Sequence, residues 1–269
     1  MFQPEKIDFT KTKTFSARDR HNLVRIDNMA VPGQEKGPLF TSPEFDVLVE
    51  KLKKARDEKR TITCFIGAHV IKCGLSRYLI WLMENGYITH LASNGAGSIH
   101  DFELAYLGGT SEHVPTAIED GSFGMWEETG RWMNEAIREG DAHGYGYGQS
   151  LAAYIDAHPE RFPNKQDCVF YRAFQMGVPM TYHVTIGTDI IHQHPYADFG
   201  AIGRTSGVDF AYFCHSISAL DGGVHMNIGS AVTGAEVFLK ALSIARNQGY
   251  PTFQITTANF DILPMGDYR

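Results

Sequence analysis

The chain has 269 residues and a mass of 30.0 kDa, which is enough for one large domain or two small ones. Hydrophobic residues make up 43% of it and charged residues 20%, so its composition argues against global disorder. The net charge of −7 argues against a general binder of nucleic acid or of anionic membranes. No apolar run is long enough to span a bilayer and no signal sequence opens the chain, so we expect a cytoplasmic protein.

The first part of the chain, residues 1–40, is polar and irregular, and we expect it to form an N-terminal arm. Leu23, Val24 and Ile26 form an apolar stretch in this arm that can pack on the body of the protein or on a partner chain. The remaining residues, 41–269, are predicted to form a single domain.

Strands and helices are predicted to alternate along this domain. A serine followed by proline predicts that a helix begins at Ser42-Pro43. β-Prone runs predict strands over 61–66, 88–92, 180–186, 224–228 and 252–257. Amphipathic runs predict one helix that ends near residue 85 and four more over 98–107, 126–139, 168–176 and 233–247. The glycine-rich stretch 140–148 predicts a surface or site loop. Such alternation with short connections is typical of an α/β domain with a mainly parallel sheet.

A glycine-containing turn, residues 93–98, follows the predicted strand 88–92. Gly95 and Gly97 let the backbone turn tightly, and the next helix begins with unpaired N–H groups and the positive end of its dipole. This geometry suits an anion such as a pyrophosphate. His100 stands where the dinucleotide-binding pattern has its third glycine, so the spacing fits an ordinary tight turn as well.

Several segments, taken together and in this order, resemble the nucleotide-binding core of deoxyhypusine synthases. They are Phe65–Leu75, Ser93–Asp101, Val169–Ala173 followed by Val178-Pro179 and the strand to Gly187, Ile228–Ala231, and Ile255–Ala258. The resemblance covers residues 60–110 and 165–262 and predicts a Rossmann-like sheet with helices on both faces. It also implies bound NAD, a homotetramer with sites at subunit interfaces, and a reaction that oxidises spermidine and passes its aminobutyl group through an enzyme lysine to a lysine of a translation factor.

The resemblance implies a set of cofactor-binding residues. Those expected at the phosphates of the cofactor are Ser93, Asn94, Gly95, Ala96 and Gly97; those expected to line the rest are Gly229, Ser230, Thr256 and Thr257, with His69 as a polar contact. No residue is assigned as a metal ligand.

The chain also departs from the family's pattern. His100 stands where the family has an acid before the residue matched by Asp101, and His183 falls where an acid near the cofactor is expected. We take His183, Asp101 and His100 as the candidate catalytic residues. No lysine follows Thr257, so we expect no aminobutyl transfer from these 269 residues, either because the function has changed or because the natural chain continues beyond Arg269.

The leading hypothesis is a deoxyhypusine-synthase-like enzyme that binds NAD or a related nucleotide and acts on a polyamine or another small amine as a homotetramer. One alternative is a metal-dependent enzyme that uses a histidine cluster, His183, His192, His194, His215 and His225. The other is a non-catalytic protein that binds a nucleotide or a polyamine. None of these hypotheses includes a nucleic-acid or membrane partner.

Overall fold

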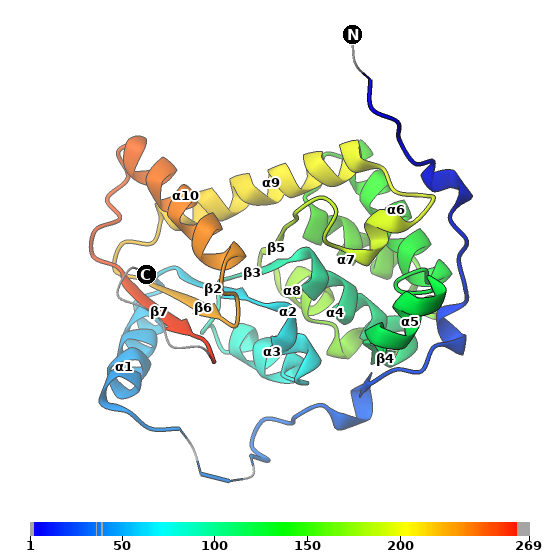
Figure 1. The fold of residues 1–269 in the computed structure, drawn as a ribbon. Helices are drawn as coiled ribbons and strands as arrows, with labels where there is room; N and C mark the ends of the chain where they lie inside the picture. The colour runs from blue at the N-terminus through cyan, green and yellow to red at the C-terminus, as the bar shows by residue number, and fades with distance from the viewer. Residues whose placement is uncertain (1–2, 36, 39, 263–269) are drawn as a thin grey trace.

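A five-stranded sheet forms the centre of the protein (Figure 1). The structure, a computed structural model, describes residues 3–35, 37–38 and 40–262, so residues 263–269 of the lysine-free C-terminal stretch lie outside the described residues. The strands are β2 (Ile62–Ile66), β3 (His90–Asn94), β5 (Met180–His183), β6 (Val224–Ile228) and β7 (Thr256–Phe260). Their order is β5-β3-β2-β6-β7, and every neighbouring pair is parallel. This arrangement confirms the predicted α/β, Rossmann-like fold.

One face of the sheet is covered by two long helices. Alternate residues of a strand point to opposite faces, and Phe65 and Ala92 point to this one. They pack against Phe213 and its neighbours in α9 (Phe199–Ser218) and α10 (Thr233–Asn247). In Figure 1 these two helices lie side by side on the same side of the sheet.

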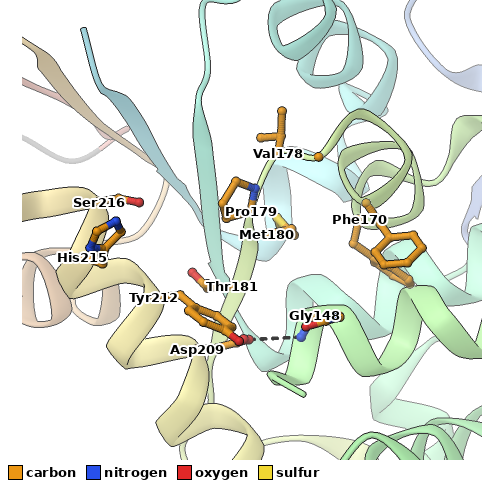
Figure 2. A pocket seen from close by; sticks show the side chains of 13 residues that line it. Gly148, Phe170, Val178, Pro179, Met180, Thr181, Asp209, Tyr212, His215 and Ser216 are labelled. Carbon is orange, nitrogen blue, oxygen red and sulfur yellow. Dashed lines mark hydrogen bonds between the residues drawn. The ribbon is translucent and has the colours of Figure 1, made fainter. Parts of the chain in front are cut away.

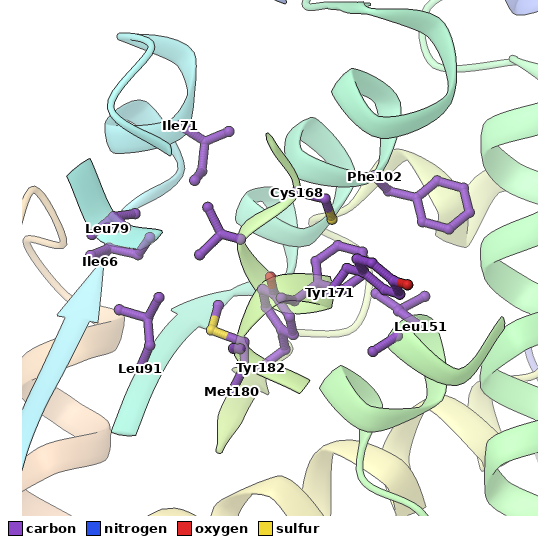
Figure 3. Packing of buried hydrophobic residues seen from close by; sticks show 14 of the residues in the cluster. Ile66, Ile71, Leu79, Leu91, Phe102, Leu151, Cys168, Tyr171, Met180 and Tyr182 are labelled. Carbon is purple, nitrogen blue, oxygen red and sulfur yellow. The ribbon is translucent and has the colours of Figure 1, made fainter. Parts of the chain in front are cut away.

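The opposite face carries the larger hydrophobic core. Figure 3 shows Ile66 and Leu91 of the sheet together with Ile71 and Leu79 of the covering helices. The helices that contribute to this core beside the sheet are α1 (Pro43–Asp57), α2 (Ala68–Lys72), α3 (Ser76–Glu84), α4 (Gly95–Leu107) and α8 (Val169–Met176). Because both faces are covered, the central strands are buried on both sides, as parallel strands usually are.

Smaller elements complete the structure. They are β1 (Val24–Arg25), β4 (Gly109–Thr110), α5 (Val114–Asp120), α6 (Glu127–Ala142), α7 (Tyr147–Ala157) and the short 3-10 helices η1 (Phe9–Lys11), η2 (Ala17–Asp19), η3 (Ile26–Asn28), η4 (Pro159–Arg161), η5 (Lys165–Asp167) and η6 (Ile190–Gln193). Helices α6 and α7 pack on each other, and α7 also packs on β5, α8 and α9. Over the described ranges, every helix is too short or too polar to cross a bilayer.

Side chains of α9 close the outer edge of the sheet at β5. The Asp209 carboxylate accepts hydrogen bonds from the backbone N–H of Tyr182 at 2.7 Å and of Gly148 at 3.1 Å. The hydroxyl of Ser206 accepts from the Val184 N–H at 3.1 Å and donates to the Tyr182 carbonyl at 2.9 Å. An edge strand needs such partners to avoid pairing with another chain.

The N-terminal arm runs along the body past α5 and α6 (Figure 1). In this arm, the guanidinium group of Arg20 donates two hydrogen bonds of 2.8 Å to the Glu103 carboxylate, and both side chains are buried. Val24 lies in β1, which pairs antiparallel with β4, and Ile26 packs against the main core. Leu23 is half exposed. The arm therefore packs on the body of its own chain.

The largest differences between the structure and the sequence prediction lie in three segments. Residues 199–218 form the longest described helix, although no helix was predicted there. The predicted loop 140–148 is shorter, because α6 continues to Ala142 and α7 begins at Tyr147. The last strand lies at 256–260 and not at 252–257. The residues before it form an irregular segment whose backbone N–H groups bond to the Asp221 carboxylate.

Candidate functional site

The carboxyl ends of the parallel strands form the edge where a ligand site is expected. Strands β2 and β6 are neighbours in the sheet. From β2 the chain continues to β3, toward one edge of the sheet, and from β6 it continues to β7, toward the opposite edge, so the connections diverge between β2 and β6. In open α/β sheets, ligands bind outside the carboxyl ends at such a switch point. The turns that follow the strand ends therefore hold the candidate residues.

The glycine-containing turn between β3 and α4 is held by its own side chains. Asn94 caps α4, because its side-chain oxygen accepts a hydrogen bond from the Gly97 N–H at 3.1 Å. Ser93 donates a hydrogen bond to the Ile66 carbonyl at 2.9 Å. A Cβ atom on Gly97 would lie 2.3 Å from the Ser93 hydroxyl oxygen. Gly97 is thus required by the packing of the turn itself.

The carboxylate of Asp189 fills the space beside Gly95. A Cβ atom on Gly95 would lie 1.9 Å from Oδ2 of Asp189. The sequence analysis placed a phosphate of the cofactor beside this glycine, at the first turn of α4. In this arrangement the anion beside the positive end of α4 is a side chain of the protein, and a pyrophosphate does not fit against Gly95.

Asp189 and His192 form a buried pair at the start of η6. The Asp189 side chain accepts from the backbone N–H of His192, and Nδ1 of His192 accepts from the N–H groups of Gly187 at 3.0 Å and Asp189 at 3.2 Å. Neutral His192 therefore carries its proton on Nε2, which lies 3.9 Å from Oδ2 of Asp189. Among the described residues, neither of these two buried atoms has a hydrogen-bond partner. Burial raises the pKa of Asp189 to about 7 and lowers the pKa of His192.

A cavity of about 230 Å³ lies between α2, α4 and the segments that precede α5 and η6, and we call it the carboxylate cavity. Its charged and polar lining residues are Arg20, Lys72, His100, Glu103, Ser111, Glu112, Thr188 and Asp189. Oε1 of Glu112 accepts hydrogen bonds from the Trp126 indole at 2.8 Å and the Gly124 N–H at 3.1 Å. Oε2 of Glu112 is buried and, like Oδ2 of Asp189, has no partner within the described part of the chain. Burial also raises the pKa of Glu112.

His100 and Asp101 are neighbours in sequence but face different surroundings. His100 lines the carboxylate cavity, its Nδ1 lies 2.7 Å from the Thr110 hydroxyl, and burial lowers its pKa to about 4. The Asp101 carboxylate accepts from the backbone N–H groups of Val169 at 3.0 Å and Phe170 at 3.1 Å, where α8 begins. Burial raises the pKa of Asp101 to about 6. The structure thus uses Asp101 to hold α8 and brings only His100 to the cavity.

His183 lies at the end of β5 in a second cavity of about 440 Å³, which we call the histidine cavity. This cavity lies between α9 and the first turn of α10, and Thr233 and Glu236 also line it. Burial lowers the pKa of His183 to about 4, so its imidazole is neutral at pH 7. His183 shares its surroundings with Phe65 and Phe213 on the α9 face, whereas His100 lines a cavity on α4.

Gly229 and Ser230 directly follow β6, at the switch point. A Cβ atom on Gly67 would lie 1.9 Å from the Gly229 carbonyl oxygen, and Gly229 has a φ of +64°. The Ser230 hydroxyl accepts a hydrogen bond from the Gly234 N–H at 2.9 Å, near the start of α10. His69 is exposed on α2, directly after β2. Close backbone packing explains Gly67, and the positive φ explains Gly229.

Thr256 and Thr257 are not at this edge. They pair with Val224 and His225 at the amino ends of β7 and β6, and they line a surface hollow against α1. Because the carboxyl ends of parallel strands lie at the opposite edge, the structure does not bring these threonines to Gly229 or to the turn at Gly95.

The histidines of the metal hypothesis do not come together. His183 and His225 lie on the face covered by α9, while His194 contacts Glu127 of α6 at 3.3 Å. In the part of the chain that the structure describes, no three histidine, cysteine or acidic side chains are placed to hold a metal ion. The predicted five-histidine cluster is therefore wrong.

Comparison with known proteins bears on the fold. No protein-family model and no curated protein sequence matches the chain. Among solved structures, ArgZ, an arginine dihydrolase from the ornithine–ammonia cycle in cyanobacteria, matches 84% of this chain with 15% identity and a TM-score of 0.51. A complex of AgrE with ornithine and NAD+ matches 78% with 15% identity and a TM-score of 0.44, and a candidate deoxyhypusine synthase from Entamoeba histolytica matches 72% with 12% identity and a TM-score of 0.43.

These comparisons bear on the fold and not on the function. At these identities, the likeness to ArgZ shows the fold alone. The matched region covers 29% of the ArgZ chain and 27% of the AgrE chain. It covers 78% of the protein from Entamoeba histolytica.

Proposed function

We propose that the chain binds a small organic amine in the carboxylate cavity. The observation that carries this proposal is that two acidic residues in the lining of the cavity, Glu112 and Asp189, each have a buried carboxylate oxygen without a hydrogen-bond partner within the described residues. A buried carboxylate without a partner is costly, and an ammonium group supplies both the positive charge and three N–H donors. An anionic ligand offers no N–H donor to these two oxygens, although Lys72 in the same lining would attract it.

The other walls favour an aliphatic amine. Ile99, Phe123 and Ile190 line the same cavity, so methylene groups can be buried between them. Lys72 also lines it and would repel a second ammonium group placed beside it. The volume of about 230 Å³ suits one end of a polyamine or a diamine of a few carbons. Asp189, whose pKa is raised to about 7, is the carboxyl group that would ionise beside such a ligand.

We also propose that NAD or a related nucleotide binds at the switch point between β2 and β6, and not against Gly95. The support is the divergence of the connections there, together with the histidine cavity that adjoins α10. The turn at Gly95 is filled by Asp189, so it does not supply the phosphate site. When bound, NAD would supply a hydride acceptor for oxidation of the amine.

Calorimetric titration with putrescine and spermidine tests the amine site, with 1,4-butanediol as the uncharged control. We expect saturable binding of the amines and none of the diol. Asp189→Asn and Glu112→Gln should each weaken amine binding at least tenfold, about 1.4 kcal/mol. Glu236→Gln, which removes a carboxylate from the histidine cavity, is the matched control and should leave it unchanged. Equal affinity in wild type and Asp189→Asn, or no binding to wild type, would contradict the proposal.

A further inference from the structure

We propose that a cavity between β5, α8 and α9, here called the aromatic cavity, binds an uncharged ring compound, independently of the amine proposed above. Its volume is about 350 Å³, within the range of small-molecule sites. Figure 2 shows Phe170 on one side of it, Tyr212 on the other, and Val178, Pro179 and Met180 between them. These walls can bury both faces of a flat apolar ring.

Two titratable residues line the aromatic cavity, Asp209 and His215, and the acidic one is already hydrogen-bonded to the backbone. Asp209 is the acidic residue in its lining, and its carboxylate accepts from the backbone N–H groups of Tyr182 and Gly148. Figure 2 shows the bond to Gly148 at the base of the cavity. A charged ligand would have to lose its hydration without gaining a counter-ion, whereas an uncharged ring loses little. The lining therefore selects against ions.

Two hydroxyl groups in the lining are joined through one histidine. The Ser216 oxygen lies 2.7 Å from Nδ1 of His90, and Nε2 of His90 lies 3.0 Å from the Thr181 oxygen. Thr181 in turn lies 3.2 Å from Nε2 of His183, which lines the histidine cavity. Burial lowers the pKa of His90 to about 3, so its ring is neutral and carries one N–H. The four side chains form a single hydrogen-bonded chain between two cavities.

The hydrogen bonds that join these four side chains can run in two directions. If Ser216 donates to Nδ1 of His90, then Nε2–H of His90 donates to Thr181, and Thr181 donates to Nε2 of His183. Reversal of every bond leaves the Ser216 hydrogen available to the aromatic cavity and places a proton on Nε2 of His183. A ring compound that donates to Ser216 favours the first direction, and one that accepts from it favours the second. Occupancy of the aromatic cavity therefore sets which nitrogen of His183 carries the proton.

The experiment is a titration of the full chain with indole, an N–H donor, and with quinoline, an acceptor, followed by 15N-detected histidine NMR. We expect saturable binding of both probes. Indole should hold His183 with its proton on Nδ1, and quinoline should move it to Nε2. Phe174→Ala, which removes a half-exposed wall residue, should weaken binding of both probes at least threefold.

Ser216→Ala should leave ring binding within a few-fold and abolish the difference between indole and quinoline at His183. Ser218→Ala is the control, because it removes a hydroxyl from the same helix without lining the aromatic cavity. No saturable binding of either probe to wild type, or unchanged binding in Phe174→Ala, would overturn the site. Identical His183 tautomers with indole and quinoline would overturn the coupling.

Discussion

At the scale of single residues, the carboxylate of Asp189 explains both a sequence feature and a property of the cavity. Gly95 has no side chain, and the space that a Cβ atom would take holds Oδ2 of Asp189. The same oxygen lies 3.9 Å from Nε2 of His192 and lacks a hydrogen-bond partner in the described ranges. The glycine that resembles a phosphate-binding position therefore accommodates an internal acid.

Gly95→Ala should destabilise the fold by about 1–3 kcal/mol, because the added Cβ atom meets a buried carboxylate. The cost should be much smaller in an Asp189→Ala background, where that carboxylate is gone. Denaturant unfolding of the four proteins of this double-mutant cycle measures the coupling. Equal costs in both backgrounds would show that the turn itself, and not Asp189, requires the glycine.

Amine binding should strengthen as the pH rises from 6 to 8. The pKa of Asp189 is raised to about 7 by burial, so its ionised fraction, which is the form that attracts an ammonium group, grows about tenfold over this range. Titration with putrescine at pH 6, 7 and 8 measures the change in Kd. Asp189→Asn should lose most of this pH dependence. A wild-type affinity that falls as the pH rises would contradict the assignment.

Sequence reasoning located the parts of the site that depend on neighbouring residues. Asn94 and Gly97 lie within one turn, and their positions after a strand predicted a turn that leads into a helix, although α4 begins at Gly95 and not at Ser98. Glu112 and Asp189 come from segments far apart in the chain, and no local spacing signals that they line one cavity. Asp101 carried a functional interpretation, yet its carboxylate bonds to α8, which is a tertiary contact without a sequence signature.

At the scale of elements, the strands were predictable where short apolar runs lie between turns. The run over 224–228 forms β6 within the predicted bounds, and 88–92 overlaps β3. Helix α9 was missed because Gly200, Gly203 and Gly207 lower its intrinsic helix propensity. It forms because one of its faces packs on the sheet and on α10, and such packing overrides propensity.

Asp209→Ala should destabilise the protein by about 3 kcal/mol, because it leaves the N–H groups of Tyr182 and Gly148 buried without partners. Asp221→Ala is a matched control: Asp221 also accepts from two backbone N–H groups, those of Phe253 and Gln254, but at an exposed position where water replaces it. Its effect should be small. Chemical denaturation compares the two, and equal effects would contradict the role of Asp209 at the sheet edge.

At the scale of the whole molecule, the N-terminal arm is fastened to the body at several points. Arg20 pairs with Glu103 of α4, and Glu128 of α6 accepts hydrogen bonds from Ser16 and the backbone N–H of Ala17. Glu103 also lines the carboxylate cavity, so the arm neutralises a charge beside the proposed site. The division into an arm and a domain follows the sequence, but the arm contributes to the packed structure.

Arg20→Ala should destabilise the protein by about 3–5 kcal/mol, since it removes the positive charge that pairs with the buried carboxylate of Glu103 and leaves that carboxylate only the hydroxyl groups of Thr110 and Thr129. Arg204→Ala is the control, because Arg204 pairs with Asp141 at the surface and its loss should change stability little. Thermal and denaturant unfolding of both variants checks this. A loss for Arg20→Ala no larger than that for Arg204→Ala would show that the arm is not held by this pair.

The homotetramer stays a prediction of the resemblance. Light scattering at micromolar concentration should give a mass four times the 30.0 kDa of the chain. A mass of 30.0 kDa would contradict it and would leave the proposed amine site within a single chain.

The most direct measurement of the central claim is titration of wild type with putrescine at pH 7 in two buffers that differ in ionisation enthalpy. Asp189 has a pKa of about 7, so about half of the molecules carry its proton before the amine binds. A bound ammonium group lowers that pKa, and the proton is released to the buffer. We predict that about half a proton is released per amine bound, so the binding heats in the two buffers should differ by about half of the difference between their ionisation enthalpies. No binding, or binding with the same heat in both buffers, would contradict the claim that an amine binds beside Asp189.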